Sequence, residues 1–564
     1  MSLIVTALCW SKNGSRNLTR LSTQLRQVSR VLGPDLEIKE DLFNFTRGRF
    51  VCNEQYETSQ RHVRFNVNEL ARRAAHAIGA SKCIKIAKYP DGMYNKSMLL
   101  TMDDGSQVVT KVPNPTAGLP HYTTASEVAT MDFVKNVIKT PVPKVLAWCS
   151  NAQNPVGAEY IIMEKVPGIE LECVWPNMEI KDRLTVVKCI AQFQQAWTSI
   201  SFTRYGSLYY SKDLEDAHVD GQALYFDAKG NHIVDEKFAI GPSTSRENFD
   251  HGRATIEFDR GPWRFLEAYH AAIAHREIAC VSQMFQLPKS PISLRGPGTY
   301  VPTRAKKLKA LHCYLDLIKF LLPADRTIST PHLWHNDLHV ANIFVDPSEP
   351  TKVVSLIDWQ STHISPLYFQ ARQPQIIDHD GPSMVGLERP QPPENLDELD
   401  PIARKHAQSL YLHQALVSLY NTLTHRRNPR LFAALQFQHT EKYLLLLLAR
   451  NLLIDGEASY LLQIAELESC WQDFSTEKPY PFFFSREERE QLLSDIEGFN
   501  RGTQAMQSIK HALGDLFPEK GVVRPDQYDE AINALEQMKE QIIEIFATSE
   551  GDKEVWEEMW PFGR

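Results

Sequence analysis

The sequence lacks an apolar run long enough to span a bilayer, and it also lacks a Cys-x-x-Cys motif. Its longest apolar stretch, Tyr443 to Ala449, stops at Arg450, which favours a core helix over a membrane span. The nine cysteines are scattered and odd in number, so reduced thiols are favoured over a disulfide framework or a zinc site. The sequence also lacks an excess of positive charge, because it has 61 basic and 69 acidic residues. The net charge of −8 argues against a nucleic-acid-binding protein.

Acidic residues are absent from the first 34 residues, where apolar side chains recur at helical spacing between arginines and serines. The basic residues of this segment are Lys12, Arg16, Arg20, Arg26 and Arg30. This composition is typical of a mitochondrial transit peptide, and the alternative is a solvated tail with an accidental charge bias. The sequence therefore predicts a transit peptide over residues 1–34 and a mitochondrial location.

Residues 331–359 hold two carboxylates and one amide at the spacing of a kinase catalytic centre. Asp337 and Asn342 are five residues apart, as in the D-x-x-x-x-N of a kinase catalytic loop, and Asp358 ends an apolar run before an aromatic residue. Phosphoryl transfer needs one carboxylate that accepts the proton of the attacking hydroxyl. It also needs an amide and a second carboxylate that hold Mg²⁺ on the phosphates of ATP.

Two other interpretations of this segment stay open. His332, His335 and His339 would line one face of a helix and could bind zinc, although Pro331 and the missing apolar repeat favour a loop. An ordinary polar turn would explain the turn residues but not the second Asp at the end of a strand.

The signature resembles that of the aminoglycoside phosphotransferase family, the small-molecule branch of the protein-kinase-like fold. The family pattern H-G-D-x-H-x-x-N is matched from His335 to Asn342, and its I-D-W/F is matched at Ile357 to Trp359. Asn336 departs from the pattern, because it stands where the family has Gly. The overall layout is similar to the fungal mitochondrial proteins of the "altered inheritance of mitochondria" type. The resemblance implies ATP and Mg²⁺ as cofactors, with His339 bracing the catalytic loop.

The residues before this motif follow the order of a kinase small lobe. Strands are expected at 83–87, 96–102, 107–112, 142–148 and 160–166, and helices at 66–78 and 123–137. Lys111 falls on the third strand, where the lysine that holds the ATP phosphates belongs, although an exposed strand lysine is the simpler alternative. Glu127 is placed to orient Lys111, although a carboxylate also suits the first turn of a helix.

The loop at 90–97 would cover the phosphates of a nucleotide. It has one glycine, Gly92, and resembles the looser phosphate loop of the family through Gly92, Asn95 and Ser97. Backbone N–H groups and the Ser97 hydroxyl are the expected phosphate contacts.

The segment Met163 to Gly168 resembles the family's hinge. The backbone from Glu164 to Val166 would hydrogen-bond adenine, and Met163 would lie behind the pocket. About 170 residues separate this hinge from the catalytic loop, so an insertion is expected near the substrate side at 205–300. A hairpin is expected there at 223–238.

These patterns predict an α+β, two-lobed, protein-kinase-like fold with a five-stranded antiparallel N-lobe and a mainly helical C-lobe. The expected division is a transit peptide at 1–34, a linker and leading helix at 35–82, a nucleotide-binding N-lobe at 83–166, a C-lobe at 167–375 and a helical extension at 376–564. The aromatic tail from Trp556 to Phe562 is expected to pack on the body or on a partner.

The leading hypothesis for function is an ATP-dependent phosphotransferase that acts on a hydroxyl of a small molecule. The second hypothesis is a catalytically weak nucleotide-binding scaffold that serves mitochondrial maintenance, with a protein partner at the C-terminal helices. A protein kinase is disfavoured, because no A-P-E-like segment follows Asp358. The sequence names no acceptor.

Overall fold

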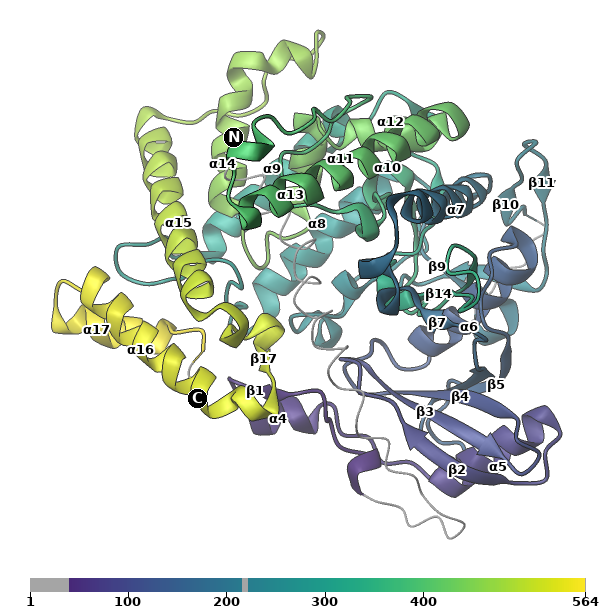
Figure 1. Cartoon of the computed structure of the whole chain (residues 1–564). Coiled ribbons are helices and arrows are strands. Elements are labelled where there is room, and N and C mark those ends of the chain that lie inside the picture. The colour runs from purple at the N-terminus through teal and green to yellow at the C-terminus, as the bar shows by residue number, and fades with distance from the viewer. Residues whose placement is uncertain (1–39, 216–221, 563–564) are drawn as a thin grey trace.

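The structure is a computed structural model that describes residues 40–215 and 222–562. The expected transit peptide, residues 1–34, lies outside the described residues. Within the described part, no helix combines the length and the apolar character that a membrane crossing needs. The cysteines of this part are free thiols. A small lobe built on a sheet stands beside a larger helical lobe, and the C-terminal helices form a further layer on the large lobe (Figure 1).

The small lobe is a five-stranded antiparallel sheet, as the sequence predicts. Its spatial order is β2-β3-β4-β6-β5. The strands are β2 (Cys83–Lys88), β3 (Asn95–Met102), β4 (Gln107–Pro113), β5 (Val145–Cys149) and β6 (Tyr160–Glu164). The leading helix α5 (Val67–Ile78) begins where the Asn66 side chain accepts a hydrogen bond from the backbone N–H of Glu69. It ends at Gly79, whose φ of 77° lies in the left-handed region that glycine adopts without strain.

Helix α6 (Tyr122–Phe133) is buried on nearly every side. It packs against β5 and β6 of the small sheet and against β9 (Ser207–Tyr210) of the large lobe. The helix continues as one π-helical turn, Val134–Ile138, which completes the span expected at 123–137. Burial on both sides explains why the sequence of α6 shows no polar stripe. It also fixes the position of Glu127 relative to both lobes.

The large lobe surrounds one extended apolar core to which its helices contribute. Its elements before the catalytic segment are β7 (Ile169–Glu170), α7 (Ile180–Thr198), β8 (Ser201–Phe202), β10 (Tyr225–Phe226), β11 (His232–Ile233), β12 (Phe238–Gly241), α8 (Leu266–Gln283) and α9 (Arg304–Leu321). The hairpin expected at 223–238 is shorter than predicted, because only β10 and β11 pair there. Phe238 instead starts β12, which pairs with β9.

Short strands hold the segment 331–366, which carries the predicted kinase motif, at the junction of the lobes. These are β13 (Pro331–Leu333), β14 (Ile343–Val345), β15 (Val353–Leu356) and β16 (Ile364–Pro366), followed by α10 (Leu367–Gln370). Strand β14 pairs with both β15 and β7, so the chain that leaves the small lobe lies directly against this segment. Gly168 permits this approach, since a Cβ there would lie 2.7 Å from the Val345 carbonyl oxygen.

The C-terminal region is helical, as expected. Its helices are α11 (Pro401–Arg427), α12 (Pro429–Phe437), α13 (Glu441–Ala449), α14 (Glu457–Glu466), α15 (Arg486–Leu513), α16 (Tyr528–Phe546) and α17 (Glu550–Met559). The last three share a separate apolar core with the connector before α9, through Leu294. Trp556 and Trp560 are 1% and 3% exposed in that core, so the aromatic tail packs on the body of the protein.

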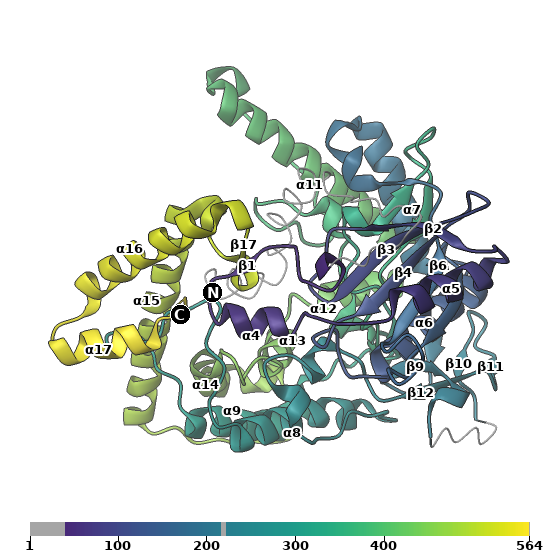
Figure 2. The same ribbon diagram turned by 90° about the horizontal axis from the view of Figure 1, so that it is seen from below.

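A segment near the start of the described chain pairs with a segment of the C-terminal region beside the small lobe. Residues before α5 form β1 (Arg49–Phe50) and α4 (Glu54–Ser59), and β1 pairs with β17 (Val522–Val523). Figure 2 shows β1 and β17 between the small sheet and helices α15 and α16. The pairing joins segments about 470 residues apart in sequence, because Arg49 lies opposite Val523.

A buried carboxylate ties the loop after β2 to the N-terminal segment. Asp91 is 3% exposed and accepts from the Thr46 backbone N–H at 2.8 Å and from Lys88 Nζ at 2.7 Å. Lys96 Nζ lies 3.8 Å from Asp91 Oδ1 and donates to the Asn44 carbonyl at 2.9 Å. Burial lowers the pKa of Lys96 to about 8. One carboxylate therefore serves two largely buried ammonium groups.

We expect Asp91→Asn to lower the free energy of unfolding by about 3 kcal/mol, because breaking a buried ion pair leaves an uncompensated charge. Urea unfolding followed by circular dichroism measures the change. The control is Asp526→Asn, since the Asp526 side chain is 71% exposed and 3.5 Å from its partner Arg524. Equal midpoints for the two variants would contradict the role given to Asp91.

Candidate active site

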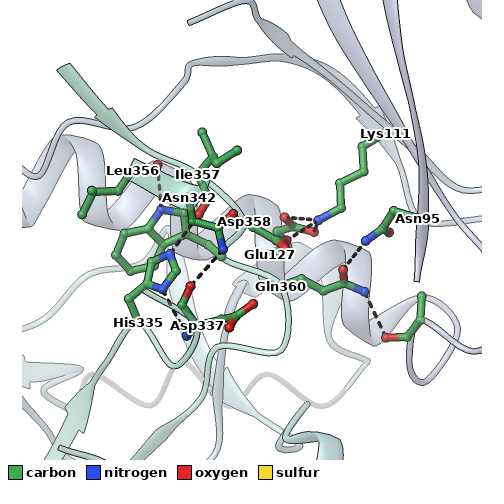
Figure 3. Close-up of polar contacts among 12 residues, drawn as sticks. Asn95, Lys111, Glu127, His335, Asp337, Asn342, Leu356, Ile357, Asp358 and Gln360 are labelled. Carbon is green, nitrogen blue, oxygen red and sulfur yellow. Dashed lines mark hydrogen bonds and ion pairs between the residues drawn. The ribbon is translucent and has the colours of Figure 1, made fainter. Parts of the chain in front are cut away.

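Lys111 joins groups from three separate elements at the junction of the lobes (Figure 3). It lies on β4 and is 7% exposed. Its Nζ atom is 2.7 and 3.0 Å from the two carboxylate oxygens of Glu127 and 2.9 Å from Asp358 Oδ1. Burial alone would lower the pKa of Lys111, but the carboxylates of Asp358 and Glu127 outweigh it and raise that pKa. The side chain is therefore a fixed ammonium ion.

Asp358 faces Lys111 because of an unusual backbone conformation just after β15. Its φ is 62°, in the left-handed region that non-glycine residues rarely adopt. The next residue, Trp359, is fully buried and donates from its indole N–H to the Leu356 carbonyl at 3.2 Å. Because Trp359 turns into the core, Asp358 points the other way, and its side chain keeps 40% exposure.

The catalytic loop fixes the backbone of Asp337 and leaves its carboxylate open. The Asp337 backbone N–H donates to His335 Nδ1 at 3.3 Å, and its carbonyl accepts from Asn342 Nδ2 at 2.9 Å. The Asp337 side chain itself is 63% exposed. Among the described residues, no group donates to Asn342 Oδ1, so the amide nitrogen holds the loop while the amide oxygen stays available. Asn342 closes a short 3₁₀ turn, Val340–Asn342, just before β14.

His335 connects the catalytic loop to the residue before Asp358. Its Nε2 lies 2.9 Å from the Ile357 carbonyl, and its Nδ1 accepts from the Asp337 N–H. These two contacts require the neutral ring with the proton on Nε2. Burial agrees with this assignment, because it lowers the pKa of His335. The ring packs edge-on against Trp359 with centroids 4.6 Å apart.

His339 lies beside Asp337 and contacts the loop at Ala341 and Asn342. Its Nε2 is 3.6 Å from Asp337 Oδ2, and its Nδ1 accepts from the Ala341 backbone N–H at 3.2 Å. Burial would lower the pKa of His339, but the carboxylates around it, Asp337 first, raise that pKa. Partial burial likewise acts to raise the pKa of Asp337, but His339 outweighs it and the net pKa is lowered. Asp337 is therefore a carboxylate at neutral pH.

The zinc interpretation is not supported by the histidine positions. His332 lies on β13 with Nε2 2.9 Å from the Thr330 hydroxyl, while His335 and His339 lie in the loop that follows. The three rings therefore do not share a helix face. Within the described ranges, no group of three or more His, Cys, Asp or Glu side chains is arranged to hold a metal ion.

Asn336, which replaces the glycine of the family pattern, fits its position without backbone strain. The φ of Asn336 is not positive, so the turn does not require glycine at this position. Its exposed side chain lies 3.4 Å from His363 Nδ1, which holds the turn from the other side.

The residues predicted for the phosphate loop divide between a loop and a strand. Gly92 lies in the loop, and a Cβ there would meet nothing closer than the Asn95 carbonyl at 3.8 Å, so packing does not demand a glycine. Asn95 and Ser97 lie on β3, and Ser97 pairs with Lys111 across the sheet. Directly paired residues share a face, so the Ser97 hydroxyl and the Lys111 ammonium lie on the same side.

Gln360 and Arg246 link the site to its surroundings, and the sequence did not single them out. Gln360 accepts from Asn95 Nδ2 at 2.5 Å and donates to the Ala117 carbonyl at 3.0 Å. Arg246 donates to the same Ala117 carbonyl at 2.9 Å and covers the Tyr94 ring at 4.0 Å. Gln360 directly follows the Asp358-Trp359 pair, and this position in the sequence could have identified it as a site residue. No sequence pattern identified Arg246, because it lies in the insertion.

The expected hinge lies at the end of β6. Met163 is half-buried against the large-lobe core. The Glu164 N–H donates to the Lys144 carbonyl at 3.0 Å, so this N–H already has an acceptor within the sheet. Among the described residues, the Val166 N–H has no hydrogen-bond acceptor, while its carbonyl accepts from Gly168 at 3.1 Å.

The antiparallel small lobe, the helical large lobe and this set of side chains define a two-lobed, kinase-like phosphotransferase fold. A model of the phosphotransferase enzyme family matches residues 243–369. The "subtelomeric hrmA-associated cluster protein" of Aspergillus fumigatus is 30% identical over 518 residues, which are 85% of this chain and 97% of that protein. The chain therefore belongs to the phosphotransferase enzyme family, whose aminoglycoside phosphotransferase signature it carries.

Other similar proteins include fungal relatives named for mitochondria. "Altered inheritance of mitochondria protein 9, mitochondrial" of Yarrowia lipolytica is 22% identical over 516 residues, with 87% of this chain and 86% of that protein covered. A crystal structure of a Ralstonia eutropha protein, provisionally assigned as an aminoglycoside phosphotransferase, aligns with 13% identity and a TM-score of 0.37. That alignment covers 78% of this chain and 99% of the other.

We expect Gln360→Ala to loosen the two segments that its amide joins. Each lost hydrogen bond is worth about 1 kcal/mol, so amides in residues 93–97 and 114–118 should exchange roughly fivefold faster. Hydrogen–deuterium exchange with mass spectrometry measures this. Gln195→Ala on the exposed face of α7 is the matched control and should leave both segments unchanged. Unchanged exchange in Gln360→Ala would refute the link.

Proposed function

We propose that the protein is an ATP-dependent phosphotransferase that moves the γ-phosphate to a hydroxyl of a small molecule. One observation carries the proposal: Lys111 is within 3.0 Å of both Glu127 and Asp358, although the three residues come from different elements. A lysine oriented by a helix carboxylate beside a metal-binding Asp is the arrangement that kinases need for phosphoryl transfer. The net charge of −8 speaks against nucleic acid as the substrate.

The donor set at the site fits a magnesium ion. Asp358 keeps part of its carboxylate exposed, and among the described residues no group donates to the amide oxygen of Asn342. Carboxylate and carbonyl oxygens are the ligands that Mg²⁺ prefers, and the phosphates and water complete its shell. When bound, the ion would neutralise charge on the transferred phosphoryl group. Asn342 and Asp358 would hold it.

Asp337 would accept the proton of the acceptor hydroxyl. Its carboxylate is exposed and fixed at the backbone, and its lowered pKa keeps it ionised at neutral pH. His339, with its raised pKa, would steady the charge of Asp337. Catalysis at such a site comes mainly from positioning and charge stabilisation.

The nucleotide would lie between the sheet and the catalytic segment. Lys111 and the Ser97 hydroxyl would contact phosphate, with the backbone at Gly92 and the Asn95 amide nearby. The base would lie against Met163, with Glu164 and Val166 at its edge, and the free Val166 N–H is the expected donor to adenine. The protein would supply orientation, because the nucleotide carries the reactive group.

We further propose a mitochondrial location, with residues 1–34 as a transit peptide. The relatives named "mitochondrial" are 22–24% identical to this chain and support this location. The C-terminal helices 376–564 are the proposed place for a protein partner. The acceptor is a small molecule that bears a hydroxyl.

We expect Asp337→Asn and Asp358→Asn to separate chemistry from binding. Asp358→Asn should weaken binding of Mg·ATP by tenfold or more, because a metal ligand loses its charge. Asp337→Asn should keep Mg·ATP affinity within about threefold and lower phosphoryl transfer to water by about 10²-fold, the usual contribution of a general base. Calorimetry and ADP release by the full chain measure the two effects.

The control for both variants is Asp526→Asn, an exposed carboxylate on the C-terminal region. It should match the wild type in both assays. Equal ADP release by wild type and Asp337→Asn would refute the role of Asp337. No binding of Mg·ATP by the wild type would refute the phosphotransferase and favour the scaffold.

A further inference from the structure

A short segment of the insertion, residues 243–250, reaches from the large lobe to the small lobe, and we call it the insertion latch. Arg246 is its central contact. Arg246 Nη1 donates to the backbone carbonyls of Thr116 and Ala117 at 2.8 and 2.9 Å. The Arg246 guanidinium also lies 4.0 Å from the centre of the Tyr94 ring. The insertion latch therefore contacts two loops of the small lobe, the one before β3 and the one between β4 and α6.

The Arg246 side chain is held from two directions. Its Nε donates to Asp250 Oδ2 at 3.1 Å, and its Nη2 forms an ion pair with Asp250 Oδ1. Its Nη1 is the atom that donates to the two carbonyls of the small lobe. A guanidinium is planar, so fixing one edge also fixes the direction of the other. Arg246 is therefore a rigid link between the lobes.

The two residues after Arg246 anchor the insertion latch in the large lobe. Asn248 is 5% exposed, and its Oδ1 accepts from Arg276 Nη1 at 3.0 Å. Glu247 forms an ion pair with Arg450 and lies 3.7 Å from Arg276 Nη1. Arg276 lies on α8, and Arg450 directly follows α13. Two helices of the large lobe thus set the position of Arg246.

A second side chain of the large lobe binds the same carbonyl as Arg246. Gln360, two residues after Asp358, donates to the Ala117 carbonyl at 3.0 Å. The other end of its amide accepts from Asn95, and these two side chains face each other in Figure 3. Ala117 is therefore the point where both connections from the large lobe meet.

The loop beneath Arg246 carries the residues proposed to contact phosphate. This loop is bound to the loop after β4, because the Asn114 N–H donates to the Tyr94 carbonyl at 2.9 Å and Asn114 Nδ2 donates to the Met93 carbonyl at 3.0 Å. The two loops are thus expected to move together. None of the atoms that Arg246 binds is a proposed nucleotide contact, so Arg246 acts on a nucleotide only through these loops.

We propose that Arg246 is a positioning residue that holds the phosphate loop closed over the nucleotide and thereby controls nucleotide exchange. This inference rests on the proposed phosphotransferase function and adds the regulation of its nucleotide site. ATP must enter and ADP must leave between the lobes, and both steps require the loop to lift from the segment that carries Asp358. Lifting breaks the contacts of Arg246 and Gln360 with Ala117. Opening of such closing segments limits turnover in many enzymes.

The contacts of the insertion latch predict a specific kinetic result. They join protein groups on both sides, so they oppose opening with and without a bound nucleotide. Removing them should speed binding and release together and change the dissociation constant much less, because a contact that is equal in both states shifts no binding equilibrium. A residue that only shapes the bound site would speed release without speeding association.

The test is stopped-flow binding of a fluorescent N-methylanthraniloyl ATP analogue with Mg²⁺ to the full chain. Arg246→Ala should raise the association and dissociation rate constants about tenfold each, since two hydrogen bonds from a charged donor are lost, and should keep Kd within about threefold. Arg246→Lys keeps a charged donor without the planar fork, so its rates should lie between those of the wild type and Arg246→Ala. Gln360→Ala should also raise both rates.

Arg264→Ala is the matched control, because Arg264 is an exposed arginine of the same insertion that lies over the exposed Phe265 ring. Its rates should equal those of the wild type. Hydrogen–deuterium exchange of the nucleotide-free chain gives an independent measure, since amides in residues 93–97 should exchange about tenfold faster in Arg246→Ala and remain unchanged in Arg264→Ala.

Unchanged rates in Arg246→Ala, or faster release at an unchanged association rate, would overturn the control of exchange by Arg246. Acceleration of both rates with little change in Kd would support it. Failure of the wild type to bind the Mg²⁺–nucleotide complex would refute the proposed function instead, and amide exchange in residues 93–97 would still show whether Arg246 holds the loop.

Discussion

The contact of one buried ammonium with two carboxylates is the constraint on which the rest of the site depends. Lys111 comes from the sheet, Glu127 from α6 and Asp358 from the large lobe, so the contact exists only when all three elements are packed together. One positive charge meets two negative charges, and Asp337 adds a third. This local negative surplus is unfavourable without a cation, which is the electrostatic reason to expect a divalent metal there.

The core under the site holds these charges in place. Trp359 and Trp334 are both buried, and each meets Trp197 edge to face with centroids 5.8 and 5.3 Å apart. His335 packs with this aromatic group. Its ring nitrogens hydrogen-bond the Asp337 N–H and the Ile357 carbonyl, so the position of the core also fixes the backbone beside the two carboxylates. The packing of Trp359 in the core thus sustains the strained φ of Asp358. The Asp358 carboxylate is thereby held against Lys111 while part of it stays exposed.

Local signals in the sequence were sufficient for the fold class, and they identified the residues that the candidate site brings together. The helix expected at 66–78 corresponds to α5, and the spacing of Asp337, Asn342 and Asp358 marked the kinase-like motif, since these features depend on neighbouring residues. Asn95 was predicted in a loop but begins β3, one residue before the expected strand at 96–102, because pairing with β4 extends to Asn95. The roles of Asp91 and Gln360 come from partners 45 and 265 residues away, and such contacts leave no periodic trace.

The pairing of β1 with β17 was beyond prediction for the same reason, yet it bears on how the two lobes can move. Strands of two residues are marginal by themselves, so the pairing of β1 with β17 depends on its side chains, with Phe50 at 3% exposure and Val523 at 6%. The segment that holds β1 is tied to the small lobe through the Thr46–Asp91 hydrogen bond, and Arg49 contacts Tyr528 at the start of α16. These contacts add a connection between the lobes besides the hinge, so opening the lobes must break the Gln360 bridge and also strain the β1–β17 pairing.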